Sequence, residues 1–129
     1  MKPLSLEEVV AINTAIVHAT GGSVGLRDAG ALSMCVAKPW QSFGGKETYP
    51  DIFSKAASVL ESIARNHPFI DGNKRTAFIT AVRVIERNGY RTHFDNKDAE
   101  ETMVRIVVKK YSIETIASWL KVNSSEYKI

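Results

Sequence analysis

The chain has 129 residues, a length typical of one folded domain, because single domains usually run to roughly 100–200 residues. Hydrophobic residues make up 44% and charged residues 24% of the sequence, close to the average for globular proteins, which excludes a disordered, collagen-like or coiled-coil chain. The net charge is only +3, and no run of basic residues is longer than two. We expect a single domain over residues 1–129, with no basic arm for nucleic acid.

The sequence shows the signals of neither a transmembrane helix nor a secretory signal peptide. The longest stretch without a charged residue, residues 9–26, is interrupted by polar residues and three glycines, so it is too polar for a transmembrane helix. Glu7 and Glu8 precede any apolar run, which excludes a signal peptide. The single cysteine, Cys35, excludes an internal disulfide and, from its apolar neighbours, is expected in the core. We expect a cytoplasmic protein.

Capping signals and apolar spacing predict three helices in the first half of the chain. Ser5 and Glu8 match a capping box, and Asp28 and Asp51 are N-cap residues before apolar runs of helical period. Pro68 disfavours helical geometry in the residue before it, so the third helix ends near residue 66. The expected helices span residues 5–21, 28–39 and 51–66.

The segment of residues 40–50, WQSFGGKETYP, has three aromatic residues and a glycine pair at the length of a hairpin or flap. Trp40, Phe43 and Tyr49 either cover the core beneath this segment or form a platform for a target protein. The sequence leaves both interpretations open.

Three further helices are predicted, over residues 73–87, from 95 or 96 to 107, and over 112–120, with a short extended piece at 90–94. The helix over 73–87 leaves only a narrow polar side, which predicts a place in the middle of a bundle. We therefore expect an all-α fold of six helices around a buried central helix, with a small flap or hairpin near residues 40–50.

The sequence HPFIDGNKR, residues 67–75, lies between two helices that are expected to be buried. Residues 72–75 begin a helix, where free backbone N–H groups and the positive end of the helix dipole attract anions. Lys74 and Arg75 are unfavourable there by about 0.3–1 kcal/mol each unless an anion is bound. Gly72 lets a phosphate approach the backbone, and Asn73 either binds the phosphate or braces the loop. A polyphosphate ligand is predicted.

Asp71 would repel a phosphate unless a divalent cation lies between them, which predicts Mg²⁺ held by this carboxylate, phosphate oxygens and water. His67 has an imidazole, the side chain best suited to take a proton from a hydroxyl at neutral pH. Taken singly, each of these residues also has a structural interpretation; Asp71, for example, could cap the helix. Together they predict transfer of a phosphate group to a hydroxyl.

The motif HPFIDGNKR resembles the signature of the Fic/Doc family, and Lys74, where Fic enzymes have glycine, is typical of its Doc-like, death-on-curing branch. The likeness extends to G25-L-R-D-A-G, F43-G-G and N88-G-Y, and so to nearly the whole chain. This resemblance implies the all-α Fic fold and assigns roles within the motif. The implied roles are His67 as general base, Asp71 as magnesium ligand, and Asn73, Lys74 and Arg75, beside Gly72, as the binding site for the phosphates of ATP.

The resemblance to Doc-like members implies a protein kinase that transfers the γ-phosphate of ATP to a Ser/Thr hydroxyl. The implied substrate is a translation factor, elongation factor Tu, and its modification would halt translation. Fic adenylyltransferases have a second arginine three residues after the first, and Phe78 stands there in this sequence. Adenylyl transfer (AMPylation) at the same site is therefore the alternative. A non-enzymatic, helical nucleic-acid-binding module is a further alternative, supported only by the pI of about 9.1.

The resemblance also implies a mode of control. Many Fic proteins have an inhibitory helix with Ser or Thr followed four residues later by Glu, and no Ser or Thr of this chain has Glu at that spacing. We therefore expect inhibition by a separate antitoxin that docks as an amphipathic helix in an apolar groove. The implied system is a bacterial or phage-encoded toxin–antitoxin pair, with DNA contacted only through the antitoxin.

Overall fold

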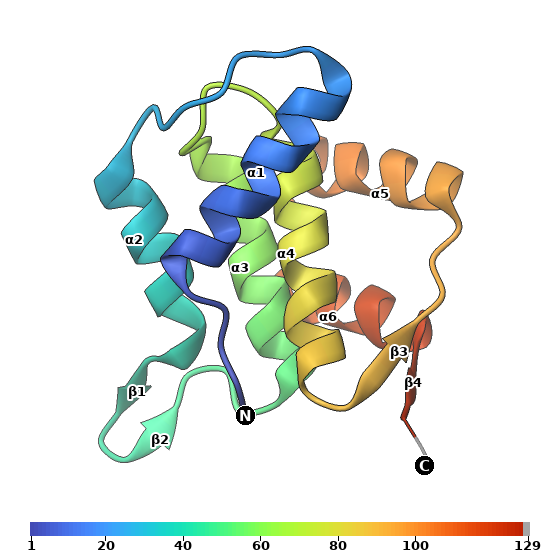
Figure 1. Cartoon of the computed structure of the whole chain (residues 1–129). Helices are drawn as coiled ribbons and strands as arrows, with labels where there is room; N and C mark the ends of the chain where they lie inside the picture. The colour runs from blue at the N-terminus through green and yellow to red at the C-terminus, as the bar shows by residue number, and fades with distance from the viewer. Residues whose placement is uncertain (128–129) are drawn as a thin grey trace.

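Six α-helices dominate the computed structural model, which describes residues 1–127 (Figure 1). Their bounds are α1 Leu6–Thr20, α2 Ala29–Ala37, α3 Ile52–Asn66, α4 Asn73–Arg87, α5 Asn96–Val108 and α6 Ile113–Val122. A 3-10 turn, η1 (Lys38–Trp40), follows α2, and the four short strands are β1 (Ser42–Phe43), β2 (Lys46–Glu47), β3 (Tyr90–Thr92) and β4 (Ser124–Glu126). The all-α prediction is confirmed. None of the helices in the described part is long and apolar enough to cross a membrane.

The predicted helix starts are confirmed by their caps. Ser5 and Glu8 form both hydrogen bonds of the capping box, at 3.1 and 2.9 Å. The side chains of Asp28 and Asp51 each accept a hydrogen bond from the backbone N–H three residues later, both at 2.9 Å. The α-helical part of α2 ends at Ala37, and the predicted terminator, proline 39, lies in the following 3-10 turn.

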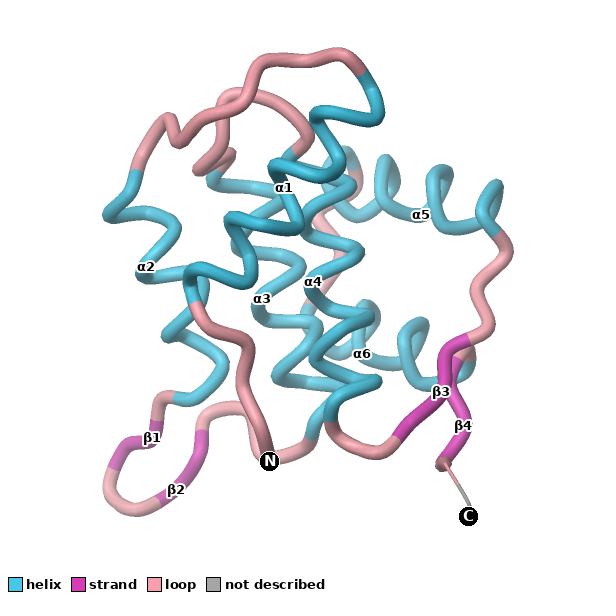
Figure 2. The backbone as a smooth tube through the Cα atoms, in the orientation of Figure 1, coloured by secondary structure: helices cyan, strands magenta, loops and turns pink. Residues whose placement is uncertain are grey.

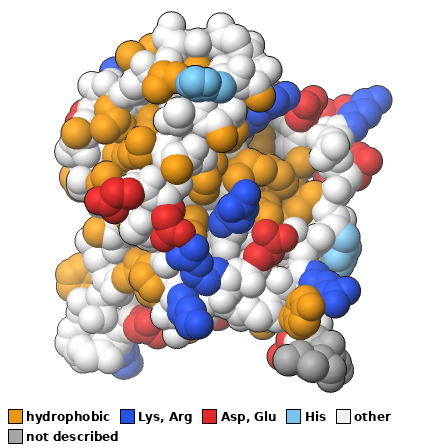
Figure 3. Space-filling view, viewed as in Figure 1, with side chains coloured by type: hydrophobic (Ala, Val, Ile, Leu, Met, Phe, Trp, Pro, Cys, Tyr) orange, Lys and Arg blue, Asp and Glu red, His pale blue; other side chains and the backbone are white. Residues whose placement is uncertain are grey.

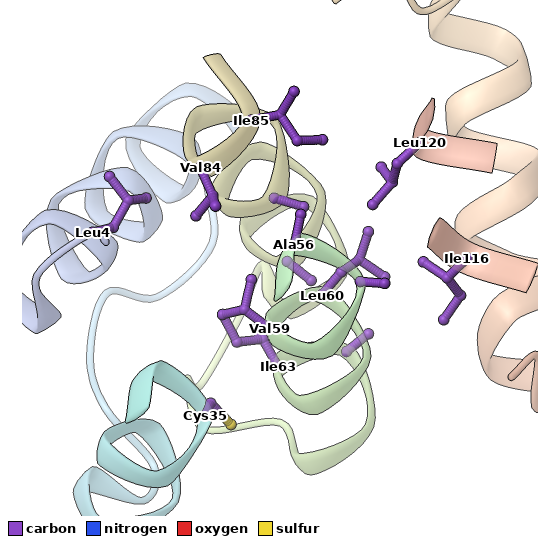
Figure 4. Close-up of a cluster of buried hydrophobic side chains, with 14 of the residues drawn as sticks. Leu4, Cys35, Ala56, Val59, Leu60, Ile63, Val84, Ile85, Ile116 and Leu120 are labelled. Carbon is purple, nitrogen blue, oxygen red and sulfur yellow. The ribbon is translucent and has the colours of Figure 1, made fainter. Parts of the chain in front are cut away.

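The buried central helix is α3, and α4 packs beside it (Figure 2). α3 also contacts α2, α5 and α6, and Figure 4 shows its side chains at the centre of the hydrophobic core. The narrow polar side of residues 73–87 predicts that α4 lies in the middle of the bundle. α4 is deeply buried too, and it lies between α1 and α3 as expected of a helix in the middle of the bundle; α3 has the larger share of buried residues.

The predicted hairpin near residues 40–50 is confirmed as β1 paired antiparallel with β2. Gly44 and Gly45 form its two-residue turn with φ angles of 57° and 79°, which non-glycine residues rarely adopt. Phe43 is 72% exposed. The hairpin lies at the N-terminal end of α3, opposite to the loop that follows the helix (Figure 1).

A buried lysine attaches this hairpin to the core. Lys55 of α3 has no exposed surface, and its Nζ atom donates to the carbonyl oxygens of Pro39 and Tyr49 and to the carboxylate of Glu47. The same ammonium group lies 5.0 Å from the centre of the Trp40 ring, a cation–π contact. Trp40 is therefore partly buried against the core and does not form an exposed platform.

Two features at the other end of the chain are only partly predicted by the sequence. An extended piece is expected at residues 90–94; its first three residues form β3 (Tyr90–Thr92), which pairs with β4 (Ser124–Glu126) in a second small sheet. β4 is not predicted, because its sequence, SSE, lacks both apolar alternation and β-branched residues. The pairing places the end of the described chain beside residues that follow α4.

We predict that Lys55→Met lowers the free energy of unfolding by about 1–3 kcal/mol, because it keeps the apolar stem but leaves buried carbonyl oxygens without a donor. Urea denaturation followed by circular dichroism measures the change. Lys46→Met, on the exposed strand β2, is the matched control and is expected to change stability by less than about 0.5 kcal/mol. Equal stability of the two variants would contradict the anchoring role of Lys55.

An ion pair between Glu8 of α1 and Arg87 of α4 predicts that the stability of the fold depends on pH in the acidic range. Hydrogen bonding from Arg87, and then from the Ser5 N–H, lowers the pKa of Glu8 from its ordinary 4.5 to about 2. A carboxyl group whose pKa is lower in the folded state stabilises the protein above its unfolded pKa, and that contribution is lost as the pH falls. The stability difference between wild type and Glu8→Gln should therefore shrink between pH 4.5 and about 2, as measured by thermal unfolding. A constant difference across that range would contradict the pairing.

Candidate active site

The sequence-predicted motif forms the loop between the C-terminus of α3 and the N-terminus of α4 (Figure 2). His67 is the C-cap of α3, in the left-handed conformation with φ 49° and ψ 58°, and its N–H donates to the Ile63 carbonyl at 3.2 Å. His67 is exposed, whereas Pro68 and Phe69 are buried. Phe69 is only 1% exposed and so anchors the loop in the core, as predicted. The buried residues hold the histidine at the surface.

Asn73 braces the loop with both atoms of its side-chain amide. Its Oδ1 accepts from the N–H of Phe69 at 3.0 Å, and its Nδ2 donates to the Phe69 carbonyl at 3.0 Å. Its side chain is directed inward, and the residue is only 8% exposed. Sequence alone leaves two roles open for this side chain, and both of its polar atoms brace the loop in the structure. The backbone N–H of Asn73, at the start of α4, is the group of this residue that a phosphate could still use.

The N-terminus of α4 has no side-chain cap. Gly72 occupies the N-cap position with φ 76°, and the first hydrogen bond of the helix runs from the Thr76 N–H to the Gly72 carbonyl at 2.9 Å. The N–H groups of residues 73–75 therefore have no acceptor within the helix. A Cβ atom at position 72 would lie 3.4 Å from both Asn13 and Val17, so a side chain there would crowd α1 as well as strain the backbone.

Lys74 and Arg75 project from this first turn and are both exposed. Arg75 lies 3.5 Å from Glu100 of α5, and both side chains are more than half exposed, so water screens the pair strongly. Two cationic side chains and uncapped N–H donors thus lie at one helix end. This arrangement suits an anion that accepts several hydrogen bonds at once.

Asp71 is held from two sides by residues that lie outside the motif and have no signal in the sequence. Its Oδ2 accepts from the Ser23 N–H at 2.8 Å, and its carbonyl accepts from Asn13 Nδ2 at 2.8 Å. Asn13, buried in α1, also donates to Thr76 Oγ1 at 3.0 Å. Because Gly72 is the N-cap, the Asp71 side chain does not cap α4. Its carboxylate is exposed and fixed beside the uncapped N-terminus of α4.

One carboxylate in this position fits the way magnesium binds to nucleotides. Mg²⁺ usually takes one or two protein carboxylates and completes its octahedron with phosphate oxygens and water. Within residues 1–127, no group of three or more His, Cys, Asp and Glu side chains is arranged to hold a metal. A cation at Asp71 would thus take its other ligands from phosphate and water.

A segment of residues 22–28, which we call the strap, lies along the motif loop. Leu26 and Phe69 form an antiparallel β-bridge, and the Ile70 N–H donates to the Gly25 carbonyl at 3.0 Å. The G25-L-R-D sequence is part of the family likeness, but its contact with the loop is not predicted by the sequence. No sequence periodicity signals a pairing between two irregular segments more than 40 residues apart.

Phe78 does not face the uncapped helix end. Its ring packs edge-on against Phe94 at a centroid distance of 5.0 Å and lies 5.9 Å from the Trp119 ring. The three rings form a partly buried cluster beside the core, between α4, α6 and the segment before α5. The position that carries a second arginine in Fic adenylyltransferases thus has a packing role in this chain.

Comparison with known proteins agrees with the fold and the motif. The sequence model of the Fic/DOC family matches residues 3–85. The chain therefore belongs to the Fic/Doc family, as the motif predicted. It is 38% identical to "Toxin Doc" of Mycolicibacterium smegmatis over 104 aligned residues, and the aligned region covers 79% of this chain and 80% of that protein. Over 121 residues, it is 31% identical to "Protein kinase doc" of Escherichia phage P1, covering 94% of each.

These relatives place the chain more narrowly than the family alone. Both are named Doc, and one of them is named a toxin. The prediction that the chain is a Doc-like toxin of the Fic/Doc family is thus confirmed. The individual roles of His67, Asp71 and residues 72–75 stay predictions.

We predict that Asn73→Ala lowers the free energy of unfolding by about 1–3 kcal/mol, because two buried backbone groups of Phe69 lose their partners. Asn73→Asp keeps the acceptor but sets a carboxylate oxygen against the Phe69 carbonyl, so it should destabilise the fold too. Chemical denaturation measures both. Asn96→Ala, in the exposed first turn of α5, is the control, and a similar loss there would refute a specific brace at residue 73.

Proposed function

We propose that this Doc-like toxin is an ATP-dependent protein kinase that transfers the γ-phosphate to a Ser/Thr hydroxyl of a translation protein. The observation that carries the proposal is the clustering, in one rigid loop and one helix end, of an exposed imidazole, an exposed carboxylate and an uncapped cationic N-terminus. Elongation factor Tu is the substrate that the family resemblance favours. The name of the phage P1 relative, a protein kinase, supports the same class of reaction.

The phosphates of ATP would bind at the N-terminus of α4. The N–H groups of residues 73–75 supply hydrogen-bond donors, and Lys74 and Arg75 supply positive charge that also offsets the charge developing on the transferred group. In the absence of an anion, these cations oppose the helix dipole. Their presence at this helix end is most easily explained by a ligand of high negative charge.

Asp71 is the residue that would hold Mg²⁺. When bound, the metal would neutralise phosphate charge and orient the phosphate chain. The Ser23 N–H fixes one oxygen of the carboxylate, so the Asp71 side chain is oriented before any ligand arrives.

His67 would act as the general base. Its imidazole accepts the proton of the substrate hydroxyl while that oxygen bonds to the γ-phosphorus atom. The bond from phosphorus to the bridging oxygen breaks, and ADP leaves with the electron pair. The position of His67 at the end of a buried helix fixes its backbone, which favours a reproducible approach to the hydroxyl.

Adenylyl transfer is the alternative use of the same site. That reaction attacks the α-phosphorus atom and releases pyrophosphate. Phe78 argues against it, because its ring is packed against Phe94 and Trp119 and supplies no further cation for the phosphate chain. Purified protein incubated with a translation extract and ATP labelled at either the α or the γ position distinguishes the two reactions. Label transferred from the γ position supports the kinase, and label transferred only from the α position overturns it.

We predict that His67→Ala lowers the transfer rate by about 10²–10⁴-fold while the protein stays folded, because a general base typically contributes that much. Transfer of γ-label to the extract measures the rate, and circular dichroism checks the fold. His93→Ala, at an exposed histidine distant in sequence from the motif, is the control. Equal transfer rates for the two variants would contradict the proposed role of His67 as general base.

We expect Asp71→Asn to raise the Mg²⁺ concentration needed for half-maximal transfer at least tenfold, because the neutral amide binds a divalent cation weakly. Titration of the transfer rate with MgCl₂ measures this. The amide can still accept from the Ser23 N–H, so the loop should keep its shape. Wild-type activity of the variant without any divalent metal would contradict the proposed ligand.

We further propose that a separate antitoxin inhibits the chain by docking a helix on the face formed by α1 and α4. A hollow of about 560 Å³ lies there between the two helices. Its lining combines apolar residues with charges of both signs, namely Leu4, Ala11, Ile12 and Ala15 with Glu8, Arg83, Glu86 and Arg87. Figure 3 shows hydrophobic side chains in the hollowed middle of this face, with charged groups around it. An amphipathic helix fits such a surface.

Expression of the chain alone in a bacterial host tests the toxin function. Growth should stop with wild-type protein, and a neighbouring gene product that is a true antitoxin should restore it. Ala15→Arg, in the lining of the hollow, should prevent rescue while toxicity persists. Normal growth with folded wild-type protein and no partner would refute the proposal.

A further inference from the structure

The carbonyl groups at the C-terminus of α3 converge on one arginine side chain of the strap. Arg27 Nη2 donates to the Asn66 carbonyl at 2.6 Å, and Arg27 Nε donates to the His67 carbonyl at 2.7 Å. These are short, charge-assisted hydrogen bonds to two consecutive carbonyls, and they lie at the negative end of the α3 dipole. The guanidinium group therefore closes the helix end from which the proposed general base projects.

The backbone of His67 needs such support. A histidine at φ 49° lies in the left-handed region, which non-glycine residues occupy at a cost unless their surroundings hold them there. The N–H groups of Arg27 and Asp28 both donate to the Pro68 carbonyl, at 2.8 and 3.0 Å, so the strap also fixes the next peptide. Of the strap's hydrogen bonds to residues 66–68, those from the Arg27 side chain can be removed without changing the backbone of the strap.

We propose that Arg27 is a positioning residue for the phosphate-transfer reaction: it holds His67 in the left-handed conformation that directs the imidazole to the hydroxyl. The inference rests on the proposed kinase function. The Nε and Nη2 atoms of Arg27 are both engaged with carbonyl oxygens at the α3 end of the loop, which assigns the side chain to the support of that end. The phosphate donors lie at the α4 end, held by Asn73, Gly72 and Asn13.

This division of the loop predicts a specific kinetic result. Arg27→Ala should lower kcat by roughly 10- to 100-fold, because a small misplacement of a catalytic group is enough for such a loss. The KM for ATP should change less than about threefold, because the α4 end keeps its own supports. Arg27→Lys keeps the positive charge but lacks the rigid planar fork of N–H groups that matches the two carbonyls, so it should have an intermediate kcat. Arg91→Ala, at an exposed arginine that stacks on Tyr127, should match wild type.

A second measurement does not depend on activity. In NMR spectra of the whole protein, the ring Cε1–H signal of His67 should shift in Arg27→Ala, while the signals of His18 and His93 stay in place. An unchanged His67 signal together with an unchanged kcat would overturn the proposal. So would parallel losses in kcat and ATP affinity that follow the unfolded fraction measured by circular dichroism.

The two arms separate this inference from the proposed function. If wild-type protein transfers no γ-label to any protein, the kinase function fails, and the NMR shift then shows whether Arg27 still sets the histidine. If wild type is active and neither arm responds to Arg27→Ala, only the positioning role fails.

Discussion

The packing of α3 against α4 is the constraint on which the site depends. The two helices are deeply buried, and only residues 67–72 join them, so the loop can hardly move without moving the core. The end of α3 presents His67, and the start of α4 presents its uncapped N–H groups. The exposed imidazole and the uncapped helix end are thereby fixed relative to each other. Rigid elements on both sides allow a short loop to hold groups at catalytic precision.

The loop is nevertheless incomplete without residues from the first quarter of the chain. Asn13 of α1 holds the Asp71 carbonyl, Ser23 holds its carboxylate, and the strap holds residues 66–70. The strap is irregular, yet its hydrogen bonds satisfy carbonyl groups that the end of α3 would otherwise leave open. α1 and the strap thus take part in shaping the site, and α1 also covers the core.

The two ends of α3 carry different surface features, the β1–β2 hairpin at its N-terminal end and the loop with His67 at its C-terminal end. At one end, the buried ammonium group of Lys55 ties the β1–β2 hairpin to carbonyl oxygens and to Trp40. At the other end, 12 residues later in the same helix, His67 is exposed; at 1.5 Å per residue the two positions are roughly 18 Å apart along the axis. The hairpin, with Phe43 exposed beside its turn, is thus a surface separate from the loop that carries His67.

The sequence by itself determined the helices, their caps and the family. Local signals were enough, since a capping residue acts within three residues and amphipathic spacing within a few turns. The motif also predicted the chemistry, because Gly72, Lys74 and Arg75 at a helix start indicate an anion site from neighbouring residues alone. Only tertiary structure decided that Asn73 braces the loop, that Lys55 is buried, and that Arg27 reaches the end of α3. These contacts join segments that are distant in sequence or depend on how a side chain is directed, and neither leaves a periodic trace. A buried lysine or a bracing arginine looks, in sequence, like any surface charge.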